Sequence, residues 1–76
     1  MSDRIEEMHK KIEAIKKWSK RLEKLRLRKK DPLSERQFCE KYGMSVAGFN
    51  RIKNGIYIPQ KANFNKIEAA FKAERV

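Results

Sequence analysis

The chain has 76 residues and a mass of 9.1 kDa, about half the size of an average domain. Its 20 Lys and Arg against 10 Asp and Glu give a net charge of +10. This excess excludes most ordinary soluble enzymes and points to a polyanionic partner, most often nucleic acid. A single cysteine and a single histidine exclude an internal disulfide and a Cys/His zinc cluster, and no apolar run is long enough to span a membrane.

These counts set the first expectations. A lone cysteine with no sign of a secretory leader predicts a reduced thiol and a cytoplasmic, nucleoid-associated protein. We expect no metal, no cofactor, no small-molecule ligand and no membrane contact. Only 3 Gly and 2 Pro are present, which disfavours a strand-rich fold with many tight turns. The fold class that we expect is therefore all-α, with about four helices.

The first 30 residues predict one long basic helix. They contain no Gly or Pro, are rich in helix formers and carry a net charge of +7, against +3 for residues 31–76. Asp31 and Pro32 should end this helix, because the residue before a proline avoids the helical conformation. Apolar residues recur every three or four positions in one stripe, with a slip near Trp18. The stripe consists of Ile5, Met8, Ile12, Ile15, Trp18, Leu22 and Leu25.

The two halves of this stripe have different expected partners. We favour packing on the domain core for Trp18, Leu22 and Leu25. The four residues before Trp18 need either the domain or a second copy, because large apolar side chains on a lone helix do not stay in water. We favour a helical homodimer. Residues 1–17 are accordingly a helical extension for dimerisation or partner contact, and residues 18–76 form the domain.

Two short helices are expected in the middle of the chain. Ser34 with Gln37 three residues later is a capping-box signature and opens a helix that runs through position 41 or 42. Gly43 supplies the left-handed residue that ends it. Ser45 can cap the next helix, over residues 46–54, and Gly55 ends that helix in turn.

A short linker over residues 56–59 and a last amphipathic helix over residues 61–74 complete the chain. We expect Cys39 to be a small buried side chain rather than a reactive thiol. The predicted core comprises Phe38, Phe49, Ile52, Phe64, Ile67, Ala70 and Phe71.

The strongest signal lies in residues 33–55, where two short helices flank a tight turn at residues 42–45. This is the spacing of a helix-turn-helix, whose second helix enters the DNA major groove. The segment resembles the lambda-repressor/Cro helix-turn-helix family, over residues 18–72. The residues that carry the resemblance are Leu33-Ser34, Cys39 in place of the usual Ala, Gly43, Phe49 with Ile52, Asn54-Gly55 and Pro59.

The resemblance implies a set of DNA contacts. Arg51 can bond guanine N7 and O6 in a bidentate manner, and Asn50 can read adenine N6 and N7. Glu35 departs from the family pattern, because a carboxylate there repels phosphate unless it turns away or pairs with Arg36. The implied base-reading residues are Val46, Ala47, Asn50 and Arg51. The implied DNA-backbone contacts are Ser34, Arg36, Ser45, Lys53, Asn54, Tyr57 and Lys61.

The expected function is therefore a sequence-specific double-stranded DNA-binding regulator, a Cro-like repressor that occupies a pseudo-palindromic operator as a homodimer. The alternative is an antitoxin-type or protein-interaction module that uses the N-terminal amphipathic helix. A basic amphipathic helix on a membrane surface is weaker, because acidic residues interrupt its basic face. An enzyme is not expected, since no catalytic constellation is visible.

Overall fold

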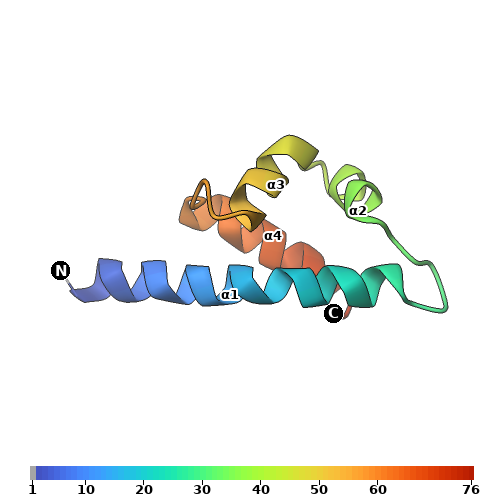
Figure 1. The fold of residues 1–76 in the computed structure, drawn as a ribbon, viewed down its shortest axis with the longest axis horizontal. Helices are drawn as coiled ribbons and strands as arrows, with labels where there is room; N and C mark the ends of the chain where they lie inside the picture. Colours follow the sequence, from blue (N-terminus) through green and yellow to red (C-terminus); the bar gives the residue numbers. More distant parts are fainter. Residues whose placement is uncertain (1) are drawn as a thin grey trace.

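The computed structural model describes residues 2–76, with side chains from Arg4 onward, and these residues form four helices and no strand (Figure 1). The helices are α1 (Ser2–Arg26), α2 (Glu35–Lys41), α3 (Val46–Lys53) and α4 (Lys61–Ala73). The expected all-α class is confirmed. The long helix α1 lies along the other three, and the molecule measures 44 × 20 × 19 Å.

Local capping signals place the ends of α2 and α3 where the sequence predicts them. Ser34 accepts a hydrogen bond from the Gln37 amide, and the Gln37 side chain accepts one from the Ser34 amide, so the capping box is confirmed. The Ser45 hydroxyl caps α3 by accepting from the Gly48 amide at 3.2 Å. Gly43 and Gly55 follow α2 and α3 with φ angles of 65° and 76°, a region that favours glycine.

The predicted end of α1 at Asp31 and Pro32 is wrong, because the helix ends at Arg26. The chain reverses direction immediately afterwards, and the Leu33 amide donates to the Leu25 carbonyl at 3.1 Å. This bond satisfies a carbonyl that a longer helix would have used itself. A turn closed between Leu25 and Leu33, rather than the proline, therefore accompanies the end of α1.

A cluster of aromatic side chains around Trp18 forms the core. Trp18 is fully buried and stacks on Phe49 of α3 at 5.4 Å between ring centroids, and Phe71 of α4 lies 5.8 Å from it. The indole N–H donates to the carboxylate of Glu68 at 2.9 Å, which satisfies the one polar atom of this side chain. The predicted core is confirmed, with Phe64 partly buried at its edge and Cys39 fully buried within it.

The first two turns of α1 extend beyond this core. Ile15 is buried and Ile12 is half-buried, whereas Ile5 and Met8 are 60% and 49% exposed. At 3.6 residues per turn, Ile5 and Trp18 lie about 140° apart around the helix, so one straight helix cannot bury both against the same core. The predicted boundary between residues 17 and 18 lies inside the uninterrupted helix, and the division there stays a prediction.

One buried carboxylate joins three parts of the chain. Glu74, just after α4, accepts hydrogen bonds from Lys41 Nζ at 2.7 Å, from the Tyr42 hydroxyl and from the Arg28 guanidinium at 3.0 Å. The hydrogen bonds from Lys41 and Tyr42 lower the pKa of Glu74 to about 2. The same bonds raise the pKa values of Lys41 and Tyr42. Glu74 thereby holds the C-terminal ends of α1, α2 and α4 together.

Candidate nucleic-acid interface

One side of α3 is free of core contacts and carries the polar residues that the sequence singles out. Phe49 and Ile52 are buried, so the opposite side of the helix faces outward. At 100° per residue, Ala47, Asn50 and Arg51 share that outward side. Ala47 and Arg51 are exposed and Asn50 is half-buried. Within the described part of the chain, the Asn50 and Arg51 side chains make no hydrogen bond or ion pair, which leaves their polar atoms available to a ligand.

Packing holds α3 rigidly in this orientation. The Met44 amide donates to the Cys39 carbonyl at 2.8 Å and closes the turn between α2 and α3. Phe49 stacks almost parallel on Trp18, with 4° between the ring planes, so α1 supports α3 from below. Burial raises the pKa of the Cys39 thiol to about 11, so it remains a protonated packing residue.

Two predicted contact residues of α3 lie away from the outward side. Val46, predicted to read bases, is half-buried and packs against the core. Lys53, predicted to contact the DNA backbone, donates to Glu35 of α2 at 2.7 Å, and both side chains are largely buried. Glu35 therefore pairs with Lys53, whereas Arg36 pairs with Glu40 at 3.1 Å. The sequence left open whether the Glu35 carboxylate would repel phosphate, turn away or pair with Arg36; in the structure it is partly buried and pairs with Lys53.

The remaining predicted backbone contacts border α3 on both sides. Ser34 and Ser45 are exposed at the N-terminal ends of α2 and α3, with their hydroxyls already engaged in capping. Asn54 is exposed directly after α3, and Tyr57 is 47% exposed in the linker. Lys61 begins α4, with its amine exposed and 4.0 Å from Glu7 of α1. These positions are compatible with phosphate contacts, and the assignments stay predictions.

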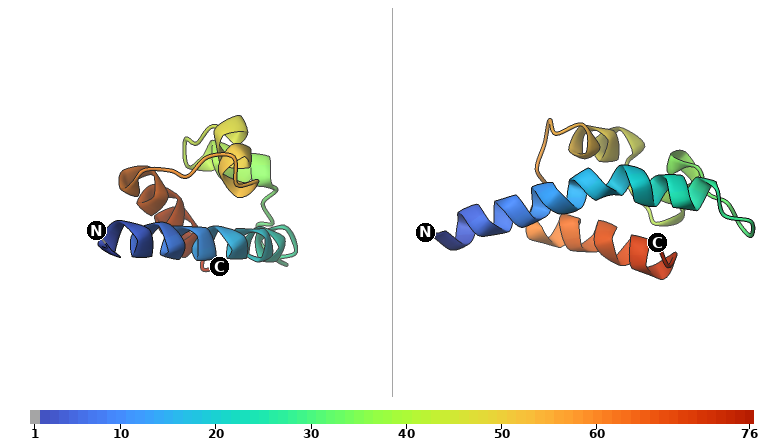
Figure 2. Two further views of the ribbon diagram at one scale, coloured as in Figure 1. Left: turned by 60° about the vertical axis from the view of Figure 1, so that its left-hand side comes forward. Right: turned by 60° about the horizontal axis from the view of Figure 1, so that its bottom comes forward.

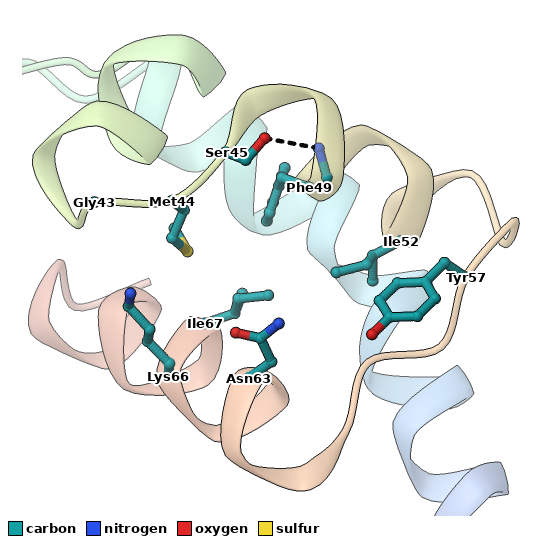
Figure 3. Close-up of a pocket in the computed structure, with 10 residues that line it drawn as sticks. Gly43, Met44, Ser45, Phe49, Ile52, Tyr57, Asn63, Lys66 and Ile67 are labelled. Atoms are coloured by element: carbon teal, nitrogen blue, oxygen red, sulfur yellow. Dashed lines mark hydrogen bonds between the residues drawn. The ribbon is translucent and has the colours of Figure 1, made fainter.

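A cleft between α3 and α4 adds two residues that the sequence analysis missed (Figure 3). It has a volume of about 280 Å³, and Asn63 and Lys66 of α4 lie across it from the turn that precedes α3. Their polar ends face the same opening as Tyr57. A sequence signal for this region exists, because residues 41–67 contain no Asp or Glu and five Lys or Arg. That signal is a long acid-free stretch rather than a motif.

No three side chains of His, Cys, Asp or Glu come together as a metal site among the described residues. No helix in that part of the chain is long and apolar enough to cross a membrane. Comparison of the chain with protein families, with characterised proteins and with solved structures finds no match. The site must therefore be interpreted from its own geometry.

Proposed function

We propose that the chain is a sequence-specific double-stranded DNA-binding protein that presents α3 to the major groove. The observation that carries this proposal is the outward side of α3, where Ala47, Asn50 and Arg51 stand together on a rigid helix. A helix fits the major groove, and Arg and Asn are the side chains that read guanine and adenine edges there.

Electrostatics supports the same partner. From residue 41 to residue 67 the chain carries only positive charges, and these residues include α3, the linker and the first half of α4. The carboxylate of Glu35, on α2, is bound by Lys53 of α3. This run of positive charges suits the phosphate backbone, which supplies most of the affinity in DNA binding.

The resemblance to the lambda-repressor/Cro family supports a finer proposal. The order of α2, the turn and α3, with α4 packed beneath, agrees with a helix-turn-helix domain. We infer that the protein is a Cro-like repressor in the cytoplasm, at the nucleoid, and that it blocks an operator by occupying it. Two copies would read a pseudo-palindromic site, with their α3 helices one DNA turn apart.

Selection from a pool of random duplexes at physiological salt tests this proposal. We expect the wild type to select a short sequence and Arg51→Ala to lose the preference at one base pair, a loss of about 1–3 kcal/mol in discrimination. The matched control is Lys61→Ala, which removes one exposed charge without touching the core. This control should weaken binding to all sequences alike and lower the salt slope by about 1. An unchanged sequence preference in Arg51→Ala would contradict the assignment of α3 as the reading helix.

A second candidate function rests on the exposed apolar residues at the start of α1. Ile5 and Met8 suit contact with another protein, as in an antitoxin-type or interaction module that grips its partner with α1. Such a module needs no DNA sequence preference. Failure of the duplex selection, together with a stable complex through Ile5 and Met8, would favour this alternative.

A further inference from the structure

A second basic surface lies on α1, away from α3. An open groove of about 770 Å³ runs between α1 and the end of α4. Its basic lining is the lysines of α1 together with Arg21, and its acidic lining is Glu13 and Glu68. The lysines are Lys10, Lys17, Lys20 and Lys24. We refer to this feature as the lysine groove.

The acidic residues of the lysine groove are already paired. Glu68 accepts from Arg21 at 2.7 Å and from the Trp18 indole, and Glu13 lies 3.5 Å from Lys16. The four lysines are exposed and form no ion pair within residues 4–76. The groove therefore presents a net positive charge that no group in the described chain neutralises.

The spacing of the lysines matches an extended polyanion. Lys10, Lys17 and Lys24 are separated by seven residues each, so they lie nearly in line along α1 and span about 21 Å. A nucleic-acid strand presents phosphates at regular short intervals over such a length. Lysine contacts to phosphate carry affinity without sequence information.

The lysine groove and the outward side of α3 cannot serve the same straight duplex. The right view of Figure 2 shows α4 running beside α1, and the groove is lined by α1 together with Glu68 and Val76, with no residue of α3. The residues of α1 that line the opposite flank, Ile12 and Ile15, face a hollow shared with Ile52 of α3. A duplex seated on α3 would therefore lie across the molecule from the lysine groove.

We propose that the lysine groove binds the sugar-phosphate backbone of a second DNA duplex, without sequence preference, so that one molecule bridges two segments of DNA. This proposal depends on the proposed function in one respect only: it takes α3 as the surface that binds the first duplex. The lining of the groove favours DNA over a membrane surface. An interfacial helix needs bulky apolar side chains next to its basic face. The apolar residues that line the groove are only Ala14 and Val76.

An assay that measures whether the protein holds two duplexes at the same time tests the proposal. A duplex with the selected sequence is immobilised, the protein is bound to it, and a labelled duplex of unrelated sequence is added at physiological salt. The groove variant is Lys17→Gln with Lys24→Gln, and its matched control is Lys29→Gln with Lys30→Gln, which removes equal charge from the exposed loop after α1. Gln and Lys have similar helix propensities, so α1 should fold in the groove variant.

We expect the wild type and the control to capture the labelled duplex. The groove variant should capture roughly tenfold less of it, or less still. The sequence preference of the groove variant on the first duplex should be unchanged. The salt slope for the unrelated duplex should fall by about 0.9 for each phosphate contact removed. Equal capture by the groove variant and the control would overturn the proposal. Binding of the first duplex without any capture of the second by the wild type would also overturn it.

A failure of the proposed function gives a different result. If no sequence is selected, direct titration of the unrelated duplex with the wild type and with the groove variant still tests whether the lysine groove binds DNA. Binding to anionic lipid vesicles at the same salt, without binding to the duplex, would replace DNA by a membrane surface and overturn the proposal.

Discussion

Glu74 is a buried carboxylate that accepts hydrogen bonds from three side chains. Its carboxylate is 5% exposed and accepts from Lys41, Tyr42 and Arg28. Such a group stabilises the fold only while it is ionised and its donors remain in place. Replacing the carboxylate by an amide keeps one acceptor oxygen but removes the charge that strengthens the bonds from Lys41 and Arg28.

We expect Glu74→Gln to lower the free energy of unfolding by about 1–3 kcal/mol at neutral pH. The pKa of Glu74 is lowered from its ordinary value of 4.5 to about 2 in the folded protein. Its stabilising contribution is therefore complete above pH 4.5 and is lost as the pH falls from 4.5 towards 2. Urea unfolding followed by circular dichroism at several pH values measures this difference.

The difference between wild type and Glu74→Gln should accordingly shrink through that acidic range. The control is Glu40→Gln, whose carboxylate pairs with Arg36 on the exposed surface and should contribute little. A difference between wild type and Glu74→Gln that stays constant down to pH 2 would refute this assignment.

At the scale of elements, α3 depends on its cap. The helix has only eight residues, too few to be stable alone, so the Ser45 hydroxyl and the packing of Phe49 must hold it. Ser45→Ala should cost about 1 kcal/mol, which lowers the melting temperature by roughly 4–8 °C in a domain of this size. Thermal melting followed by circular dichroism checks this value.

The variant Ser45→Asp separates the cap from the DNA contact. Aspartate is an equally good N-cap, so the melting temperature should stay near that of the wild type. The new carboxylate at the end of α3 should nevertheless repel phosphate and weaken DNA binding. Equal losses of stability in Ser45→Asp and Ser45→Ala would show that the hydroxyl does not act as a cap.

Features encoded by neighbouring residues are the ones that the sequence predicts correctly. The caps at Ser34 and Ser45 and the left-handed Gly43 depend on residues within one turn, and all appear as expected. The end of α1 instead coincides with a hydrogen bond from the Leu33 amide back to the Leu25 carbonyl, and no cap or glycine in the sequence marks this turn.

Ion pairs between elements that are distant in the sequence could not be predicted from it either. From the sequence, Arg21 is interpreted as one more charged residue on the solvent side of α1. In the structure it binds Glu68, forty-seven positions away, and lies 4.4 Å from the ring centre of Phe71. The pairing of Glu35 with Lys53 also depends on how α2 and α3 cross. The outward residues of α3 were predictable because the buried Phe49 and Ile52 fix its orientation.

At the scale of the whole molecule, the first turns of α1 carry large apolar side chains that the described chain does not cover. Ile5 and Met8 lie beyond the core, although two polar contacts join this part of α1 to the rest of the chain: Lys11 donates to the Pro59 carbonyl at 3.1 Å, and Glu7 lies 4.0 Å from Lys61. A second copy would cover these apolar residues, as the proposed homodimer requires.

We expect light scattering to give the mass of a dimer for the wild type and that of a monomer for Ile5→Glu with Met8→Glu. Both residues are exposed in the single chain, so the changes should leave the domain folded. Leu27→Glu is the control, because Leu27 is 62% exposed at the other end of α1 and should not affect the mass. A mass unaltered by the double change would exclude this surface as the dimer contact.

Trp18 has a practical consequence for all of these measurements. It is the single tryptophan of the chain, and it is completely enclosed between Phe49 and the rings of α4. Its fluorescence should therefore shift to longer wavelength when the protein unfolds and the indole meets water. Because the indole stacks directly under α3, the same emission is placed to register a ligand docking on that helix, without any attached dye.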